Sequence, residues 1–387
     1  MNVSHETDPA ENPFSPTDPP GSLTAKTLET DPPQFSIYVP AWNGSQWLAK
    51  AIESVLAQDY HHWELVVADN ASTDDLESIV AGFKDPRVRY HRWTTHTDLY
   101  ENFNRSVTLC RYRWVQPLGI DDRLRPGCLR KMAQRIVEME NAGVQLGAVI
   151  TAARRVDPEG QLANARYYGA NGRREMADGL YDARRWLLSE TERGWAPWIT
   201  GTIAIPAEII AEMGGLFRPE IGSSADIELA LRISAYGSIA YIAEELLDYT
   251  VTDESDGNSR AAMDRAGGLS VPTTAAALIS GLRVHEHRRN VTQEERKQVS
   301  RAIAHAYLRR AAQHRYRAGG RGRLYTLRDL IGVVRYDPFR LLSPLQLLFA
   351  LTILVAPSDL IARLLRNPPR VPLLATGLGI VLPDPHN

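Results

Sequence analysis

Cysteine is scarce in this 387-residue sequence, and the two that occur, Cys110 and Cys128, both stand among apolar residues. Such a pair is typical of reduced thiols in a cytoplasmic protein, which excludes a disulfide-rich secreted scaffold. An export signal is also missing. Met1 to Pro33 carry acids, Pro, Ser and Thr in place of a basic start and an apolar centre. We expect residues 1–33 to be disordered, because they cannot bury enough apolar surface.

A strong excess of either charge is absent as well, since the formal net charge is -2. This excludes a typical nucleic-acid-binding protein. Hydrophobic content of 44% and charged content of 23% are ordinary for a globular protein with a sizeable core. The average hides an asymmetry, because residues 283–340 carry fifteen Arg and Lys against five Asp and Glu. The length accommodates one large domain with an appendage, or two domains.

Short apolar runs alternate with helical patterns from residue 34 onward. The apolar runs that predict strands are 35–40, 63–68, 112–118 and 146–151, and a further short strand is expected over 87–91, after the turn at Asp85-Pro86. The segments with apolar residues at helical spacing are 45–56, 76–83, 98–107 and 126–136. Ser45 is the expected cap of the first helix. Strand–helix alternation with short connections predicts an α/β fold, a doubly wound, mostly parallel sheet.

Acidic residues follow two of these predicted strands. Asp69 ends the second, and Asp121 and Asp122 follow the apolar run that closes at Leu118. In an open α/β sheet the carboxyl ends of strands face one crevice, where ligands bind. Adjacent carboxylates repel each other unless a cation lies beside them, and Mg²⁺ or Mn²⁺ holding a phosphate meets that need. The alternative is structural, with Asp69 and Asp122 capping the helices that follow.

Four segments in this order carry a resemblance to a known family: 39–44 (VPAWNG), 54–58 (SVLAQ), 64–74 (ELVVADNASTD) and Asp121-Asp122 before Pro126. Together they resemble the nucleotide-sugar half of family-2 glycosyltransferases, the inverting group with the GT-A, Rossmann-like fold. The resemblance implies a glycosyltransferase domain over residues 34–252.

The resemblance also implies a donor site and a metal. The implied donor-binding residues are Pro40, Ala41, Asn43, Asp69, Asn70, Asp121 and Asp122. Asp122 is the implied ligand of Mn²⁺ or Mg²⁺, with Asp121 touching the sugar or the metal's waters. The family pattern has a further Asp where Gly119 stands, and many relatives have a His where Thr252 stands. The third protein ligand is therefore open, and the candidate substitutes are Asp253, Asp256 and His285.

The implied catalytic base is Asp226, which precedes a helical pattern and could instead be only its N-cap. The family usually has Glu before this Asp, and here Ala225 stands there. Weaker candidates for acceptor contacts are Trp195, Trp198, Thr202 and Glu228. Aromatic faces stack well on sugar rings, but two Trp beside Pro197 and Gly201 are equally compatible with a core position.

The C-terminal third is expected to be helical, with a basic extension over 253–336 and an apolar helix and tail over 337–387. Pro344 and Pro357 limit the uncharged helix to about twelve residues, or about 18 Å. A hydrocarbon core of about 30 Å needs more, so a full span is excluded. With arginines flanking it, residues 341–366 could lie in a membrane interface. Packing against the catalytic domain is the alternative.

The sequence and the resemblance together predict a metal-dependent, inverting glycosyltransferase. It would move a hexosyl or deoxyhexosyl group from a nucleoside-diphosphate sugar to a glycan or lipid-linked acceptor, in cell-surface polysaccharide or glycolipid synthesis. No nucleic-acid partner is expected, and the expected location is cytoplasmic, peripheral on the inner membrane. One alternative is a catalytically inactive nucleotide-sugar-binding protein on the same fold. A pyrophosphorylase is disfavoured, because no Gly-rich basic phosphate loop follows the first strand.

Overall fold

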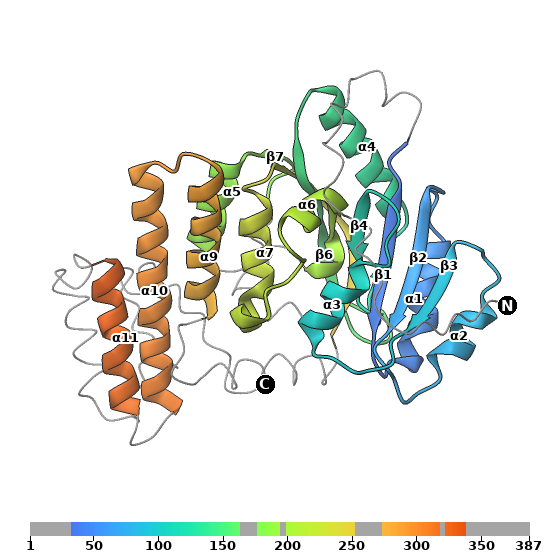
Figure 1. Ribbon diagram of the computed structural model, residues 1–387, viewed down its shortest axis with the longest axis horizontal. Helices are drawn as coiled ribbons and strands as arrows, with labels where there is room; N and C mark the ends of the chain where they lie inside the picture. The colour runs from blue at the N-terminus through green and yellow to red at the C-terminus, as the bar shows by residue number, and fades with distance from the viewer. Residues whose placement is uncertain (1–31, 163–175, 194–198, 252–272, 318–321, 338–387) are drawn as a thin grey trace. The chain divides into compact units, whose positions relative to one another are not determined.

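The computed structural model describes residues 32–162, 176–193, 199–251, 273–317 and 322–337 (Figure 1). The chain divides into two compact units. One comprises Met1–Arg154, Trp198–Phe217 and Ala240–Thr250, and the other comprises Arg155–Pro197, Arg218–Ile239 and Val251–Asn387. The domain boundaries expected from the sequence, at residues 33, 252 and 336, stay predictions.

The first unit is built on a mixed sheet, and the four strands of its parallel part were predicted from the sequence. These strands are β1 (Phe35–Ala41), β2 (Trp63–Asp69), β3 (Val88–Arg92) and β4 (Trp114–Pro117), and they lie side by side in the order β3-β2-β1-β4. The sheet continues with β8 (Ile203–Pro206), β6 (Leu146–Val156), β9 (Ser238–Thr250) and the short β5 (Arg123–Leu124). β8 runs antiparallel to β4 and to β6, and β5 runs antiparallel to β9. The predicted α/β class with a largely parallel sheet is confirmed.

Four helices of this unit begin close to the predicted positions: α1 (Ser45–Leu56), α2 (Leu76–Gly82), α3 (Leu99–Val107) and α4 (Cys128–Asn141). The helix α6 (Ala207–Glu212) and the 3₁₀ turn η2 (Thr200–Thr202) were not predicted. Asp75 caps α2, and Asp98 caps α3 by accepting the N–H of Glu101 at 3.0 Å. Ser45 is not a cap, because it is the first residue of α1. Its N–H instead donates to Asp74 Oδ2 at 2.8 Å, so a neighbouring loop satisfies this helix end.

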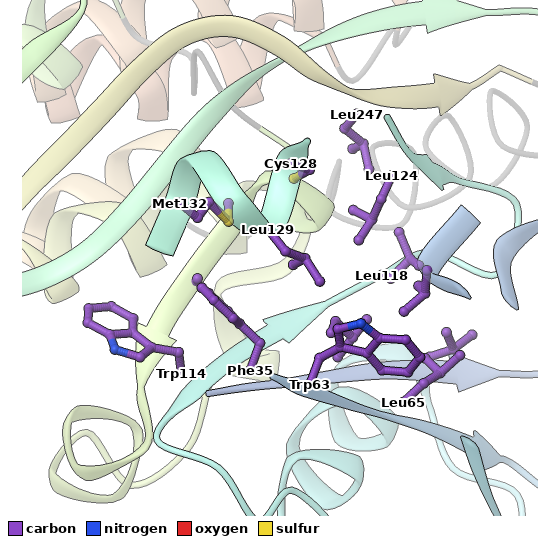
Figure 2. Close-up of a cluster of buried hydrophobic side chains, with 14 of the residues drawn as sticks. Phe35, Trp63, Leu65, Trp114, Leu118, Leu124, Cys128, Leu129, Met132 and Leu247 are labelled. Atoms are coloured by element: carbon purple, nitrogen blue, oxygen red, sulfur yellow. The ribbon is translucent and has the colours of Figure 1, made fainter. Parts of the chain in front are cut away.

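Helices cover both faces of the sheet, as the side chains of β1 show by pointing alternately to one face and the other. Phe35, Ile37 and Val39 belong to the buried core that also holds apolar residues of α1 and α4, part of which Figure 2 shows. Tyr38 points to the opposite face, where its ring meets Phe103 of α3 edge-on at 6.3 Å. Both faces of β1 are therefore buried, which explains why its sequence is a nearly continuous apolar run.

The second unit is mainly helical, as predicted for the C-terminal part. Its elements are β7 (Gly179–Tyr181), α5 (Ala183–Arg193), a 3₁₀ segment η3 (Pro219–Ser224), α7 (Ala225–Ile233), α9 (Thr273–Arg288), α10 (Gln293–Arg317) and α11 (Gly322–Tyr336). Helices α10 and α11 pack through a small apolar cluster, and Tyr307 stacks on Tyr336 at 6.0 Å. Within the described ranges, no helix is long and apolar enough to cross a membrane. The segment predicted to touch a membrane, 341–366, lies outside the described residues.

Candidate active site

The register of the parallel strands brings one row of residues to the carboxyl edge of the sheet. Ala41 at the end of β1 pairs with Asp69 at the end of β2, and Asp69 pairs with Arg92 at the end of β3. The loops that follow are joined by hydrogen bonds, since Asn70 N donates to Ala41 O at 2.8 Å and Asn43 N donates to Ser72 Oγ at 3.1 Å. Pro40 lies buried one residue before the edge. The loops after β1 and β2 therefore lie together at this edge, and the predicted convergence of Asp121 and Asp122 on the same crevice stays a prediction.

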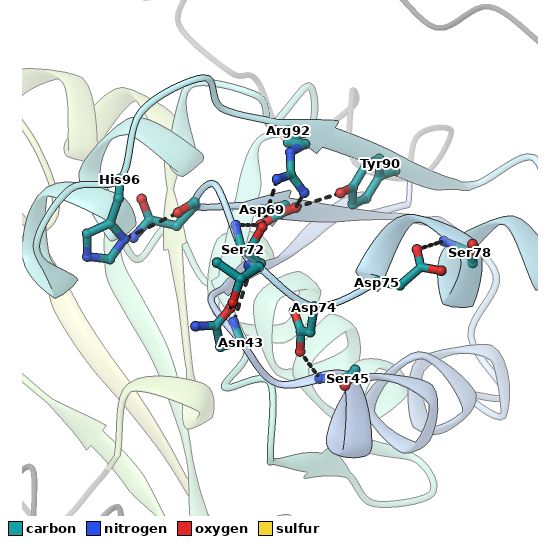
Figure 3. A network of polar contacts seen from close by, with 12 residues as sticks. Asn43, Ser45, Asp69, Ser72, Asp74, Asp75, Ser78, Tyr90, Arg92 and His96 are labelled. Carbon is teal, nitrogen blue, oxygen red and sulfur yellow. Dashed lines mark hydrogen bonds and ion pairs between the residues drawn. The ribbon is translucent and has the colours of Figure 1, made fainter.

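Asp69 is fully buried and held by three hydrogen bonds (Figure 3). Oδ1 accepts the N–H of Ser72 at 2.8 Å. Oδ2 accepts Tyr90 Oη at 2.6 Å and Arg92 Nη1 at 2.8 Å. Asp69 caps no helix, because the cap of α2 is Asp75. The Asp69 carboxylate thus fixes the turn after β2 and ties it to the half-exposed guanidinium of Arg92.

Two asparagines named by the sequence hold the neighbouring loops. Asn43 Oδ1 accepts the N–H of Thr73 at 2.8 Å. Asn70 bonds the backbone of Thr97 with both ends of its amide, at 2.9 Å each, and also accepts Arg105 Nη2. The amide oxygen of Asn43 and both ends of the Asn70 amide thus hold the backbone of these loops.

Several residues at this edge of the sheet were not predicted from the sequence. Tyr90 and Arg92 belong to β3, and only the register of β3 against β2 places them beside Asp69. Trp42, with about half its surface exposed, lies with its ring 4.7 Å from that of His96. Trp42 belongs to the segment 39–44, but nothing in the sequence indicates that His96, more than fifty residues later, is its neighbour.

The two adjacent carboxylates occupy the turn between β4 and β5. Asp122 is 5% exposed, and its Oδ1 accepts the N–H of Thr250 in β9 at 3.0 Å. Burial, and next the charge of Asp121, hold the pKa of Asp122 well above its usual range. Burial also raises the pKa of Asp121. Two neighbouring carboxyls whose charged forms are this disfavoured, beside the buried and unpartnered hydroxyl of Thr250, fit a site that binds a divalent cation.

A complete protein cage for a metal is absent from the described ranges, where no three His, Cys, Asp or Glu side chains could hold one ion together. His285 contacts its own surroundings in the second unit, since Nε2 meets Leu231 O at 2.9 Å and Nδ1 accepts Arg289 Nε at 2.8 Å. The other candidate substitutes, Asp253 and Asp256, lie outside the described residues, as does Thr252. A cation at Asp121 and Asp122 would therefore take further oxygens from a ligand and water, as Mg²⁺ commonly does.

Asp226 lies in the first turn of α7, in the second unit, where its Oδ1 accepts the N–H of Ile227 at 2.8 Å. It is not the N-cap, which is Ser224. Burial of the carboxyl raises the pKa of Asp226 to about 6. This carboxyl is therefore largely ionised at neutral pH and more basic than an ordinary aspartate, a combination suited to a general base.

The candidate acceptor residues contact protein where they are described. Glu228 is fully buried, and its Oε1 lies 3.2 Å from Arg218 Nη1 and accepts Ser280 Oγ at 2.8 Å. Thr202 is buried in η2 and donates its hydroxyl to Ile199 O at 2.7 Å. Trp195 and Trp198 lie outside the described residues. Glu228 and Thr202 thus hold local structure, a role that the sequence pattern did not indicate.

The first unit thus combines a mixed sheet, helices on both faces of that sheet and an acidic turn after β4. Residues 36–182 match the model of Glycosyl transferase family 2.

Proteins of known sequence or structure resemble this chain over part of its length. A protein of Mycobacterium tuberculosis is 26% identical over 217 residues, 55% of this chain and 66% of its own. The succinoglycan biosynthesis protein ExoO of Rhizobium meliloti is 35% identical over 114 residues, 30% of this chain and 32% of its own. The match therefore spans less than two thirds of either relative. A mannosyltransferase of Pyrobaculum calidifontis, solved with GDP-Man and Mn²⁺, is 18% identical with a TM-score of 0.48, covering 84% of this chain and 88% of that one. Those ligands are a property of that protein.

Proposed function

We propose that this protein is an inverting glycosyltransferase that moves a sugar from a nucleoside-diphosphate sugar to an acceptor hydroxyl. The observation that carries the proposal is the pair of adjacent carboxyls, Asp121 and the buried Asp122, in the turn after β4. A divalent cation would stabilise the charged forms of two such carboxyls, and a cation at the carboxyl edge of a sheet is placed to hold a diphosphate.

The donor would bind along the row Ala41, Asp69 and Arg92. Asp69 and Arg92 neutralise each other in part, so this edge offers fixed hydrogen-bonding groups without a strong field against an anionic donor. Asp122 would hold Mn²⁺ or Mg²⁺, with Asp121 binding its waters or the sugar. When bound, the cation supplies positive charge to the departing diphosphate.

Asp226 would act as the general base. It accepts the proton of the acceptor hydroxyl while that oxygen forms a bond to the anomeric carbon. The bond from the anomeric carbon to the phosphate oxygen breaks at the same time, and its electron pair leaves with the nucleoside diphosphate. One displacement inverts the anomeric centre. A pKa of about 6 gives Asp226 both an ionised ground state and useful basicity at neutral pH.

The acceptor belongs to the same proposal. The relative from Rhizobium meliloti is named for succinoglycan biosynthesis, which supports a growing polysaccharide or its lipid-linked precursor as the acceptor. A hexosyl or deoxyhexosyl group is the sugar proposed. Synthesis of such a polymer at the cytoplasmic face of a membrane would suit the apolar run at 341–358, with its flanking arginines.

The decisive experiment is calorimetric titration of UDP, GDP and dTDP, with and without Mn²⁺, into the wild type and Asp122→Ala. Micromolar binding of one diphosphate that needs the metal and is lost in Asp122→Ala supports the proposal. Asp59→Ala is the matched control, because Asp59 is a half-exposed carboxylate paired with Arg130 on the surface and should bind like the wild type. Absence of binding for every diphosphate would contradict it.

Turnover separates an enzyme from a binding protein on the same fold. With the preferred donor, release of the nucleoside diphosphate should be at least a thousandfold slower in Asp226→Asn, while its binding of the diphosphate stays within twofold of the wild type. A wild type that binds the donor but releases no product with any acceptor of this class would identify a binding protein.

A further inference from the structure

The residue that departs from the family pattern at the acidic turn, Gly119, has a specific steric relationship to Asp122. A Cβ added at Gly119 would lie 2.6 Å from Asp122 Oδ2 and 3.1 Å from Asp121 Oδ1. Carbon and oxygen atoms that are not bonded do not approach to 2.6 Å. The side chain that Gly119 lacks and the carboxylate of Asp122 therefore require the same space.

Asp122 cannot give way freely in this position. Its Oδ1 accepts the N–H of Thr250 at 3.0 Å, and this backbone group is fixed in β9. On another side lies Gly201, whose added Cβ would meet Leu247 Cδ2 at 3.0 Å and Asp122 Oδ2 at 3.6 Å. Oδ2 thus sits beside two glycine backbones, and rotating the carboxylate would break the bond to Thr250.

We propose that Gly119 is a positioning residue for Asp122: the missing side chain at 119 leaves the space that Asp122 Oδ2 fills, so that this chain presents its cation-binding carboxylate from position 122. The inference rests on the proposed function for the role of the cation, but not for the steric part. Gly119 would act only through Asp122. The backbone of Gly119 is not in the left-handed conformation, so a side chain at this position causes no backbone strain. The effect of such a side chain is therefore its collision with the carboxylate of Asp122.

The steric part is tested by a double-mutant cycle on thermal unfolding, which needs no ligand. Gly119→Ala should lower Tm by several degrees in the wild type. In the Asp122→Ala background the same change should leave Tm within about one degree, because the carboxylate that it meets is gone. Gly82→Ala is the control, since nothing lies within 4 Å of its added Cβ. An equal loss of Tm in both backgrounds would overturn the proposal.

The cation part is tested by Mn²⁺-dependent titration of the diphosphate that binds the wild type. Gly119→Ala should weaken binding at least tenfold and Gly82→Ala should not change it. Moving the carboxylate, with Gly119→Asp combined with Asp122→Gly, should bind at least tenfold more tightly than Asp122→Gly alone. The proposal fails if Gly119→Ala binds within twofold of the wild type, or if the moved carboxylate restores nothing.

The two proposals fail in different ways. If the wild type binds no diphosphate with Mn²⁺, the proposed function is wrong, and the Tm cycle still decides the relationship of Gly119 to Asp122. If the wild type binds with Mn²⁺ and the Tm cycle is additive, the function stands and only the positioning role is wrong. Should Gly119→Ala fail to fold, the folded state of Gly119→Ala/Asp122→Ala decides, because the proposal requires the double variant to fold.

Discussion

Both carboxylate oxygens of Glu228 lie 3.1 Å from Nε of Arg232, one helical turn further along α7, and the two side chains are almost completely buried. Burial lowers the pKa of Arg232, which the charge of Glu228 opposes. Arg218, at the start of η3, and Ser280 of α9 meet the same carboxylate. Glu228 therefore connects three segments of the second unit.

Glu228→Gln should destabilise the protein by roughly 3–5 kcal/mol, because it leaves the Arg232 cation buried without its carboxylate. Urea unfolding measures this difference. Asp59→Asn removes a carboxylate from a half-exposed pair with Arg130 and should cost at most about 1 kcal/mol. Equal effects of the two substitutions would show that Glu228 is not a structural centre of its unit.

The second prediction concerns the pH dependence of turnover. Asp226 must be ionised to accept a proton, and its pKa in the free protein is raised to about 6, so kcat/KM should fall as pH drops through about 6 and level off above it. The expected slope below that pH is tenfold per pH unit. Steady-state rates between pH 4.5 and 8.5 measure it. A rate that stays constant down to pH 5 would contradict the assignment of Asp226.

Asn104 and Phe217 give a third prediction, within the first unit. The side-chain amide of Asn104 donates to Phe217 O and accepts Phe217 N, both at 2.8 Å, across 113 residues of sequence. Asn104→Asp replaces the donor with an oxygen facing a carbonyl oxygen, which should cost about 2 kcal/mol. Urea unfolding of Asn104→Asp measures it. Asn290→Asp, at an exposed position, should stay within about 0.5 kcal/mol of the wild type.

His285 predicts a component of acid instability. Burial, and then the charge of Arg289, lower its pKa from 6.5 to about 4, which Glu295 opposes. Between pH 6.5 and pH 4, the imidazole of His285 is therefore protonated in the unfolded chain and neutral in the folded chain. Stability from this group is intact above pH 6.5 and is lost as pH falls from 6.5 toward 4, by up to about 3 kcal/mol.

The test of His285 compares two substitutions by urea unfolding at pH 7.5 and pH 5. His285→Gln should lose less stability between these pH values than the wild type does, because no titrating ring remains. His61→Gln, at an exposed ring, should behave like the wild type. An unchanged pH dependence in His285→Gln would assign the acid instability to other groups.

Much of the first unit could be predicted from local sequence. Apolar runs such as 35–40 and 63–68 are buried on both faces, and only strands inside a covered sheet need that composition. The helices over 45–56 and 98–107 follow from apolar spacing. The acidic residues at the strand ends follow from the same pattern, because a strand ends where the apolar run does.

The roles of individual side chains at the site could not be predicted in this way. In the sequence, Asp226 and Glu228 are both acidic residues at the start of a helix, and nothing distinguishes their roles. Their different environments, a buried ion pair for Glu228 and a carboxyl whose pKa is raised by burial for Asp226, depend on what packs against each face of α7. The same holds for His285. Its residue type makes it a candidate metal ligand in the sequence, but in the structure its ring contacts Leu231 and Arg289 instead.

The sequence by itself determined the α/β class, the order of strands and helices from β1 to β4, and the acidic turn at 121–122, because each depends on residues close together in the chain. Tertiary structure decided which distant groups meet: Arg92 beside Asp69, Thr250 on Asp122, and the space at Gly119 that Asp122 fills. Such contacts depend on strand register and side-chain packing, which arise only when segments far apart in sequence compete for the same volume.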